Sequence, residues 1–442
     1  MKKSRFFRRR LSPPIIISGN FLLLIIFGTL LLKLPIATEH SISWTDAFFT
    51  ATSASTVTGL GVFDIGSTLT TFGEIILLTL IQLGGLGIMT FAVAILMLFG
   101  KKIGIQNRIY IRDSYNQQTV GGMVKYVRLI LLFVLSIETL AITLLSIHWI
   151  PIFGWRDGIY YSTFHVISAF NNAGFSIFPE NLIPFVGDPI VTIILSSLFV
   201  IGGLGFFVVM DIWNKKSFHH WTLHTKMMIT GTLLLNVIAT ITLFLLEYNN
   251  VNTIGDFSVG NKILASYFQA VSPRTAGFNT IPTGNMEEPS LLFTMLLMFI
   301  GGGTASTASG IKLTTFMVIV YATIAYFRGI SEPHLFGRTI KTEILLRSLA
   351  ITTVSLSTII SSLFLLTITE SIPLFPLAFE VFSAFGTVGL SMGITGDLSS
   401  IGKLIVCLVM FMGRIGPLTL FYLLLKPKKE SYKFPYDQVH TG

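Results

Sequence analysis

Four glycines at similar intervals along the 442-residue chain are the residues best suited to chemistry. Each follows an aromatic residue ten positions earlier and a small residue five positions earlier; they are Gly59, Gly174, Gly277 and Gly389. Glycine adopts backbone conformations that strain residues with a Cβ, so a turn built on it can point successive carbonyl oxygens at one axis. A ring of such carbonyls can replace the water shell of a monovalent cation. The four turns therefore predict a selectivity filter for a cation.

Close helix packing is the alternative account of these glycines, because small residues let helices approach one another inside a membrane. A single glycine of this kind is more often a packing residue. Four in one register, each behind a short apolar segment, favour a pore.

Around each glycine the sequence predicts a helix, a short half-helix, a glycine turn and a second helix. The fold class is therefore an all-α membrane protein with four tandem helix–pore-loop–helix repeats around one pore and eight transmembrane helices. The predicted first helices are 15–34, 126–150, 227–247 and 348–369, and the second helices are 74–99, 190–212, 290–325 and 401–425. The half-helices 44–56, 159–171, 262–273 and 376–386 are too short to cross a ~30 Å hydrocarbon core and must dip in and return. The predicted repeats are 1–100 with pore loop 44–62, 101–214 with pore loop 159–177, 215–328 with pore loop 262–280, and 329–425 with pore loop 376–392, followed by a cytoplasmic tail at 426–442.

Composition supports this membrane location. Hydrophobic residues make up 52% of the chain and charged residues only 12%, about half the charged share of a soluble domain. These values argue against a soluble enzyme, a disordered chain and a protein that binds nucleic acid. The net charge of +9 arises from Lys and Arg concentrated in segments 1–10, 101–128, 215–226, 328–347 and 426–433. The positive-inside rule places these segments and both termini in the cytoplasm of a multi-pass cell-membrane protein.

A run of small residues interrupts the second helix of the third repeat. Gly, Ser and Thr are poor helix formers in such a run, so we expect a polar intramembrane loop, with a close-packed helix as the alternative. The expected gate comprises Gly301, Gly302, Gly303, Thr304, Ala305, Ser306, Thr307, Ala308, Ser309 and Gly310, with Lys312 and Arg414. Arg414 lies in an apolar run, where a charge must face a cavity or a partner. We hypothesise that Arg414 and the loop 301–310 together block the pore at rest.

These motifs resemble the Trk/Ktr/HKT superfamily of potassium transporters over almost the whole chain. Thr-Val-Thr-Gly59, Asn-Asn-Ala-Gly174-Phe, Pro-Arg-Thr-Ala-Gly277-Phe and Phe-Gly-Thr-Val-Gly389 are similar to the four filter turns of that superfamily. The match is closest to the compact Ktr-type membrane subunit of bacteria. The resemblance implies that carbonyl groups bind K⁺ at Val57, Thr58, Gly59, Asn172, Ala173, Gly174, Thr275, Ala276, Gly277, Thr387, Val388 and Gly389.

The resemblance also carries functional expectations. It implies K⁺ uptake, often Na⁺-dependent, and a glycine at the first filter position goes with K⁺ selectivity in that family. A pore for another monovalent cation, such as Na⁺, is the alternative. The chain contains no nucleotide-binding motif and no expected cofactor of its own, with K⁺ as substrate and Na⁺ as a candidate activator. The implied partners are a cytoplasmic nucleotide-binding RCK subunit, a second copy of the chain in a homodimer, and membrane lipid.

Several charged residues outside these motifs need partners. Arg274 precedes the third filter glycine, and we expect it to point behind the filter to an acid. Glu138 falls within a span and must be paired or face the interior. Acids expected on the outer side, among them Asp46, Glu74 and Glu380, could concentrate cations at the pore mouth. His165 is expected to pack beside the second filter turn.

Overall fold

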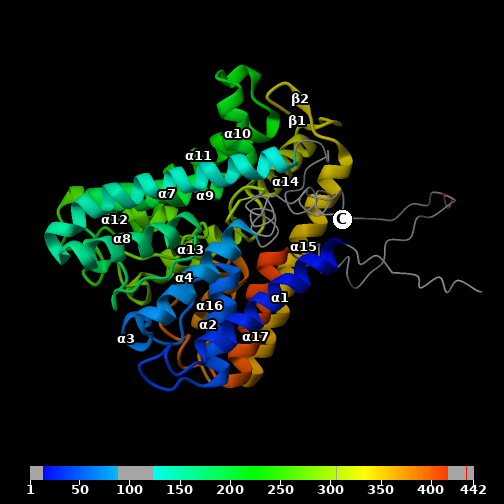
Figure 1. Cartoon of the computed structure of the whole chain (residues 1–442). Helices are drawn as coiled ribbons and strands as arrows, with labels where there is room; N and C mark the ends of the chain where they lie inside the picture. Colours follow the sequence, from blue (N-terminus) through cyan, green and yellow to red (C-terminus); the bar gives the residue numbers. More distant parts are fainter. Residues whose placement is uncertain (1–12, 88–122, 305, 417–434, 436–442) are drawn as a thin grey trace, which may run out of the picture.

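The computed structural model describes residues 13–87, 123–304, 306–416 and residue 435. Almost all regular structure in this part is helical (Figure 1). The long helices are α1 (Pro13–Leu32), α7 (Met123–Phe153), α11 (Leu223–Glu247) and α15 (Thr342–Thr369). The half-helices are α2 (Trp44–Thr56), α8 (Trp155–Phe170), α12 (Val259–Val271) and α16 (Leu374–Gly386). The remaining helices are α3 (Ile65–Thr68), α4 (Thr71–Leu86), α9 (Pro189–Leu204), α10 (Phe206–Asn214), α13 (Glu288–Phe299), α14 (Leu313–Phe327) and α17 (Ser400–Ile415), with 3₁₀ turns at Ile183–Phe185, Phe218–His220 and Thr283–Asn285 and a small hairpin of β1 (His334–Leu335) and β2 (Arg338–Thr339).

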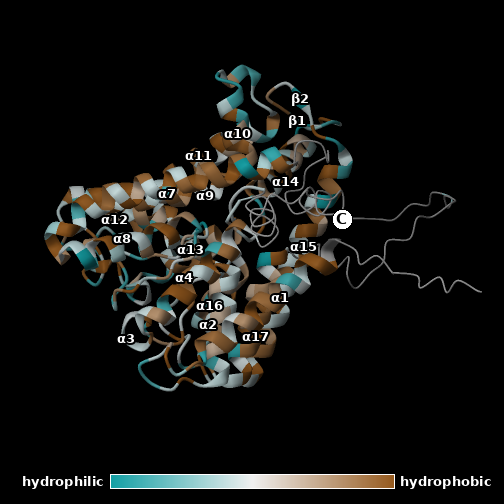
Figure 2. Cartoon of the chain, viewed as in Figure 1, coloured by the Kyte–Doolittle hydropathy of each residue, from teal (hydrophilic) through white to brown (hydrophobic). Residues whose placement is uncertain are grey.

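The long helices α1, α7, α11 and α15 are apolar and long enough to cross a membrane. Hydrophobic residues cover most of α7 and α11 (Figure 2), and many of them are exposed, such as Leu135 and Leu233. Exposed leucines on a helix of this length fit contact with lipid. The chain is therefore a mostly helical membrane protein.

The count of eight transmembrane helices, one of them interrupted by the loop 301–310, stays a prediction. Four helices in the described residues could span a membrane, or five if the bent pair α9 and α10 forms one span. The predicted second helices are interrupted: α4 stops at Leu86, α9 at Leu204 and α17 at Ile415. Each stop precedes a glycine with positive φ, at Gly87, Gly205 and Gly416. Segments 88–99 and 417–425 of two predicted helices lie outside the described residues, as do most of segment 101–128 and all but residue 435 of the tail 426–442.

Each half-helix contacts a helix that follows a different half-helix in the chain. Together these contacts form a closed ring. The contacting pairs are α8 with α4, α12 with α9, α16 with α13, and α2 with α17. The last pair joins the beginning of the chain to its end, and α2, α16 and α17 lie together in Figure 1. An ion pair between Lys403 Nζ and Asp46 Oδ1, at 2.9 Å, spans this junction. The four half-helices thus surround a common centre.

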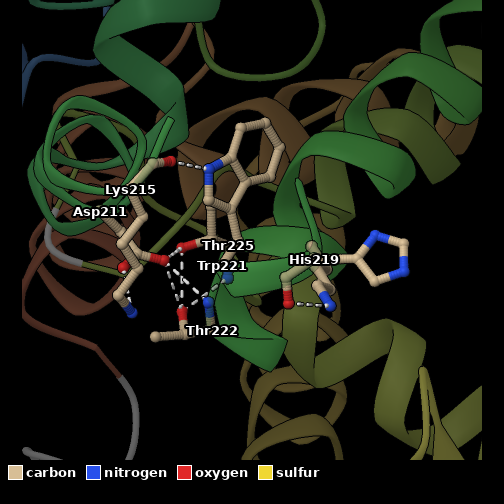
Figure 3. A network of polar contacts seen from close by, with 7 residues as sticks. Asp211, Lys215, His219, Trp221, Thr222 and Thr225 are labelled. Carbon is tan, nitrogen blue, oxygen red and sulfur yellow. Dashed lines mark hydrogen bonds and ion pairs between the residues drawn. The ribbon is translucent and has the colours of Figure 1, made fainter. Parts of the chain in front are cut away.

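A compact polar network fixes the corner between α10 and α11 (Figure 3). The axes of α9 and α10 differ by 91°, so α10 turns away from the helical bundle (Figure 1). Asp211 on α10 accepts hydrogen bonds from the Thr222 backbone N–H at 2.9 Å and the Thr225 hydroxyl at 2.6 Å. Its other carboxylate oxygen lies 2.8 Å from Lys215 Nζ. Because Thr222 caps the N-terminus of α11, the carboxylate also interacts favourably with that end of the helix dipole.

Candidate functional site

The turns after the four half-helices share an unusual backbone pattern. In each, the first and third residues have positive φ and the residue between them does not. The first residues are Val57 (φ 59°), Asn172 (58°), Thr275 (84°) and Thr387 (47°), and the third are Gly59 (93°), Gly174 (67°), Gly277 (78°) and Gly389 (97°). Positive φ at a β-branched residue is a strained conformation that the surroundings must impose. Each half-helix also ends at its turn, so the negative end of its dipole lies there.

Backbone hydrogen bonds hold the middle residue of each turn. The N–H of Thr58 donates to the Ser53 carbonyl oxygen at 2.8 Å, and the N–H of Val388 donates to the Ser383 carbonyl oxygen at 2.8 Å. The other two turns repeat this at 2.8 Å, from Ala173 to Ser168 and from Ala276 to Ser272. These N–H groups all point back at their own half-helices, although the bond spans four residues in the third turn and five in the other three.

The serine side chains brace the turns as well, and the sequence analysis did not single them out. The hydroxyls of Ser53 and Ser383 accept from the N–H groups of Gly59 and Gly389, both at 3.1 Å. Ser168 donates to the Phe175 carbonyl oxygen at 2.8 Å. Ser272 donates to the Phe278 carbonyl oxygen. A serine five or six positions before every filter glycine was the signal in the sequence that could have revealed them.

The four glycines meet in a closed ring. A Cβ added to Gly59 would lie less than 3.0 Å from the Ala173 carbonyl oxygen of the next turn. The same holds for Gly174 against the Ala276 oxygen, Gly277 against the Val388 oxygen, and Gly389 against the Thr58 oxygen. Each turn therefore touches the next in chain order, and the fourth touches the first. Any side chain at these four positions would meet a backbone oxygen as well as an unfavourable φ.

A second set of glycines lets the inner helices approach the half-helices closely. A Cβ at Gly84, Gly202 or Gly413 would collide with a carbonyl oxygen at the end of a half-helix, respectively that of Ser55, Phe170 or Phe385. The motif that begins with each of these glycines ends three residues later at Gly87, Gly205 or Gly416. The motif thus combines a close contact with a helix stop.

The predicted break in the third inner helix is present. Residues 300–312 separate α13 from α14, and within this segment Ile300 and Ile311 form a parallel bridge. The segment binds the second repeat through its backbone, because Gly303 N–H donates to the Gly203 carbonyl oxygen at 2.7 Å and Thr307 N–H to the Gly202 carbonyl oxygen at 3.2 Å. Ala305 lies outside the described residues.

Side chains tie this loop to the turns and to the other repeats. Asn172 Nδ2 donates to Thr307 Oγ1 at 2.9 Å, which joins the second turn directly to the loop. Arg414 donates through Nη1 to the Thr307 carbonyl oxygen and through Nη2 to the carbonyl oxygens of Gly84 and Gly85. Lys312 Nζ donates to the Ala308 carbonyl oxygen at 2.8 Å. Arg414 therefore bridges the loop and the end of α4.

Glu138 has its partner on α4. Gln82 Nε2 donates to both carboxylate oxygens of Glu138, at 3.1 and 3.2 Å. Gln82 Oε1 in turn accepts from Asn171 Nδ2, which precedes the second turn. The buried carboxyl group thus connects α7 to the second half-helix through an amide.

Two expectations about charged residues were wrong. Arg274 points away from its turn, but its described partners are Asn236 Oδ1 at 3.0 Å and Thr232 Oγ1 at 3.5 Å on α11, not an acid. Glu74 and Glu380 are not surface acids at a pore mouth, because their side chains are buried. Asp46 is partly exposed at the start of α2; burial raises its pKa, and hydrogen bonds from Ser43 and Lys403 outweigh this and hold it below its usual value.

Comparison with known proteins identifies the family. A family model described as "Cation transport protein", TrkH, matches residues 5–433. The chain belongs to the TrkH family of cation transport proteins. It is 51% identical over 433 residues to "Ktr system potassium uptake protein B" of Bacillus subtilis, covering 98% of this chain and 97% of that protein. It is 38% identical to "Potassium/sodium uptake protein NtpJ" of Enterococcus hirae, with 98% of each chain covered.

A solved TrkH structure has the same fold. The potassium transporter TrkH from Vibrio parahaemolyticus superimposes with a TM-score of 0.73, covering 96% of this chain and 87% of that one at 20% identity. The resemblance to the Trk/Ktr superfamily is therefore confirmed. Membership of a family of cation transport proteins also confirms the prediction that the chain is a transporter and not an enzyme.

Proposed function

We propose that this chain carries K⁺ into the cell through a pore whose selectivity filter is formed by the four glycine turns. The closed ring of turns is the observation that carries the proposal. Two residues with positive φ flank one without it in each turn, a pattern that can direct successive carbonyl oxygens to one side, as a ring of oxygen ligands for a dehydrated cation requires. The proposed ligands are the carbonyl oxygens of residues 57–59, 172–174, 275–277 and 387–389.

K⁺ is favoured over Na⁺ as the transported ion. Gly59 holds the first filter position, and two relatives are named as potassium uptake proteins. A pore for another monovalent cation such as Na⁺ is the alternative, supported by the potassium/sodium uptake protein among the relatives. An activating role for Na⁺, in which Na⁺ itself is not transported, is compatible with K⁺ transport and with transport of another monovalent cation.

The loop 301–310 is the proposed gate. It is held on one side by the second repeat and on the other by Arg414, which also contacts α4. A loop of small residues fixed by a few hydrogen bonds can move at low cost once those bonds are exchanged. Arg414 adds a positive charge beside the proposed path, which opposes cation passage while the loop is closed.

Control of this gate is assigned to a separate chain. We propose a homodimer in the plasma membrane, with both termini in the cytoplasm and with segments 101–125, 215–226 and 328–347 facing a cytoplasmic nucleotide-binding RCK subunit. The basic charge of these segments supports the orientation. The relatives' description as part of a "Ktr system" supports a multi-subunit assembly. Copurification of an RCK subunit, lost on charge reversal at Lys215 and Lys216, would support the docking surface; binding that survives reversal in all three segments would contradict it.

Ion flux into proteoliposomes tests the transport proposal. The purified full chain is reconstituted alone and with its regulatory subunit, and K⁺ and Na⁺ influx are measured separately. We expect K⁺ influx that exceeds Na⁺ influx, together with rescue of growth of a K⁺-uptake-deficient strain at low K⁺. Influx of Na⁺ equal to or greater than that of K⁺ would reject the choice of ion, and no flux of either ion with the partner present would reject the pore.

A further inference from the structure

Two of the four filter turns are attached to a buried titratable side chain at the same register. Nine residues before the filter glycine stands His165 in the second half-helix and Glu380 in the fourth. Both side chains are 0% exposed. Each reaches the serine two residues after its glycine, respectively Ser176 and Ser391. Neither contact involves a residue that is proposed to bind the ion.

His165 holds the second turn through one tautomer. Its Nδ1 lies 2.8 Å from the Tyr161 carbonyl oxygen, which can only accept, so Nδ1 carries the hydrogen. Nε2 of the neutral ring then accepts from Ser176 Oγ at 3.0 Å. The ring stacks on Phe178 with centroids 4.5 Å apart and meets the edge of Trp149 at 5.3 Å. This aromatic packing fixes the ring plane, and with it the position of Ser176.

Glu380 holds the fourth turn through a triangle of oxygens. Ser391 Oγ lies 2.8 Å from Glu380 Oε2, and Thr395 Oγ1 lies 2.5 Å from Oε1. Thr395 Oγ1 also lies 3.1 Å from Ser391 Oγ. No ion pair with Glu380 is present within the described ranges.

The number of hydrogens in this triangle favours a neutral carboxyl group. A protonated Glu380 donates to Thr395, Thr395 donates to Ser391, and Ser391 donates back to Glu380. Three hydrogens then fill the three contacts, whereas a carboxylate leaves the contact between the two hydroxyls without a hydrogen. Cyclic chains of hydrogen bonds also strengthen one another in a buried site.

At this register the other two turns have no titratable side chain, and no such attachment is present among the described residues. The same register is occupied by Thr50 in the first half-helix and Phe268 in the third. Thr50 Oγ1 has no hydrogen-bond partner among the residues the structure describes. The residues two after the glycines are Gly61 and Asn279. Because the ring of glycines runs in chain order, the two attached turns face each other across the centre.

We propose that His165 and Glu380 are positioning residues that fix two opposite filter turns through Ser176 and Ser391 and thereby set the discrimination between K⁺ and Na⁺. This inference rests on the proposed transport function. Carbonyl rings discriminate between ions only while their oxygens keep a defined spacing and number. Fixing one opposite pair limits the approach of the oxygens across the pore, in addition to the backbone and serine contacts that hold all four turns.

The ratio of K⁺ to Na⁺ influx in proteoliposomes tests the inference. We expect Glu380→Ala and Ser391→Ala each to lower the ratio by about fivefold, the effect of one lost hydrogen bond. Glu380→Gln keeps the three-bond cycle, because its amide donates to Thr395 and its oxygen accepts from Ser391, so the ratio should stay within about twofold of the wild-type value. His165→Leu and Ser176→Ala should lower the ratio in the same way.

Thr50→Val is the matched control, since it changes the same register in an unattached turn and should leave the ratio unchanged. A wild-type ratio in both Ser176→Ala and Ser391→Ala, which remove only hydroxyls, would overturn the inference. The inference would also be overturned if Glu380→Gln lowered the ratio of K⁺ to Na⁺ influx as much as Glu380→Ala does. Failure of the proposed function is distinguishable, because the unmodified protein would then give no K⁺ flux.

Discussion

Replacing Arg414 by lysine should open the proposed gate at rest. Arg414 uses two nitrogens, with Nη1 donating to the Thr307 carbonyl oxygen and Nη2 to the carbonyl oxygens of Gly84 and Gly85. A lysine keeps the charge but has one ammonium nitrogen in place of the two nitrogens of a planar fork, so it cannot reproduce the geometry of both contacts, and we expect it to lose one of them. Losing one charged hydrogen bond costs about 1.5–3 kcal/mol. If that bond exists only in the closed state, the open population rises roughly 10- to 150-fold.

The assay is K⁺ influx into proteoliposomes that contain the chain without its regulatory subunit. We expect Arg414→Lys and a deletion of residues 304–308 to raise this resting influx. Arg274→Lys is the matched control, because Arg274 is also a partly buried arginine but bonds to Asn236 and Thr232 on α11. Resting influx that stays at the wild-type level in both gate variants, with both proteins folded, would refute the reasoning.

Three further changes have expected outcomes. Gly277→Ala adds a Cβ against the Val388 carbonyl oxygen at a φ of 78°, so it should reduce K⁺ influx at least tenfold, whereas Gly19→Ala, with nothing within 4 Å, should leave influx unchanged. Asp211→Asn weakens the contacts to Lys215 and to the start of α11, and should speed tryptic cleavage after Lys215 in a limited digest. The lowered pKa of Asp46 means that its ion pair stabilises the fold above about pH 4, and that this contribution is lost as the pH falls through the lowered pKa. The unfolding temperature of Lys403→Met in detergent should therefore lie below that of the wild type at pH 7, and the difference should shrink as the pH falls below about 4. Equal unfolding temperatures at pH 7 would contradict this.

The positions of the four glycines in the sequence were enough to predict the glycine turns. Both the positive φ and the close approach of a neighbouring carbonyl oxygen require a glycine at that one position. Spacing in the sequence put the half-helices within one or a few residues of their bounds; the second, for instance, begins at Trp155 where residue 159 was expected. The break in the third inner helix could be predicted for the same reason, since a run of small residues cannot sustain a helix.

The remaining features depend on contacts between distant segments. Hydropathy predicted that three of the second helices continue past Gly87, Gly205 and Gly416, because hydropathy does not report the positive φ that these glycines adopt. The amide partner of Arg274 lies on α11, 38 residues away in the sequence, and the burial of Glu380 depends on the helices that pack around α16. A charged residue in an apolar run signals the need for a partner, but its identity is set by the packing of the folded chain.

The contact between α2 and α17 has a consequence for biosynthesis. Lys403 and Asp46, which pair across that contact, are 357 residues apart. At about 5–20 residues per second, translation takes roughly 20–70 s to supply the second partner after the first has been made. During that interval α2 lacks the neighbour that packs against Phe49, which shares a buried hydrophobic cluster with Val406 and Met410 of α17 in the finished protein. The ring therefore closes only after nearly the whole chain has been inserted, and a chain interrupted before α17 would leave a membrane-embedded half-helix that the cell must shield or degrade.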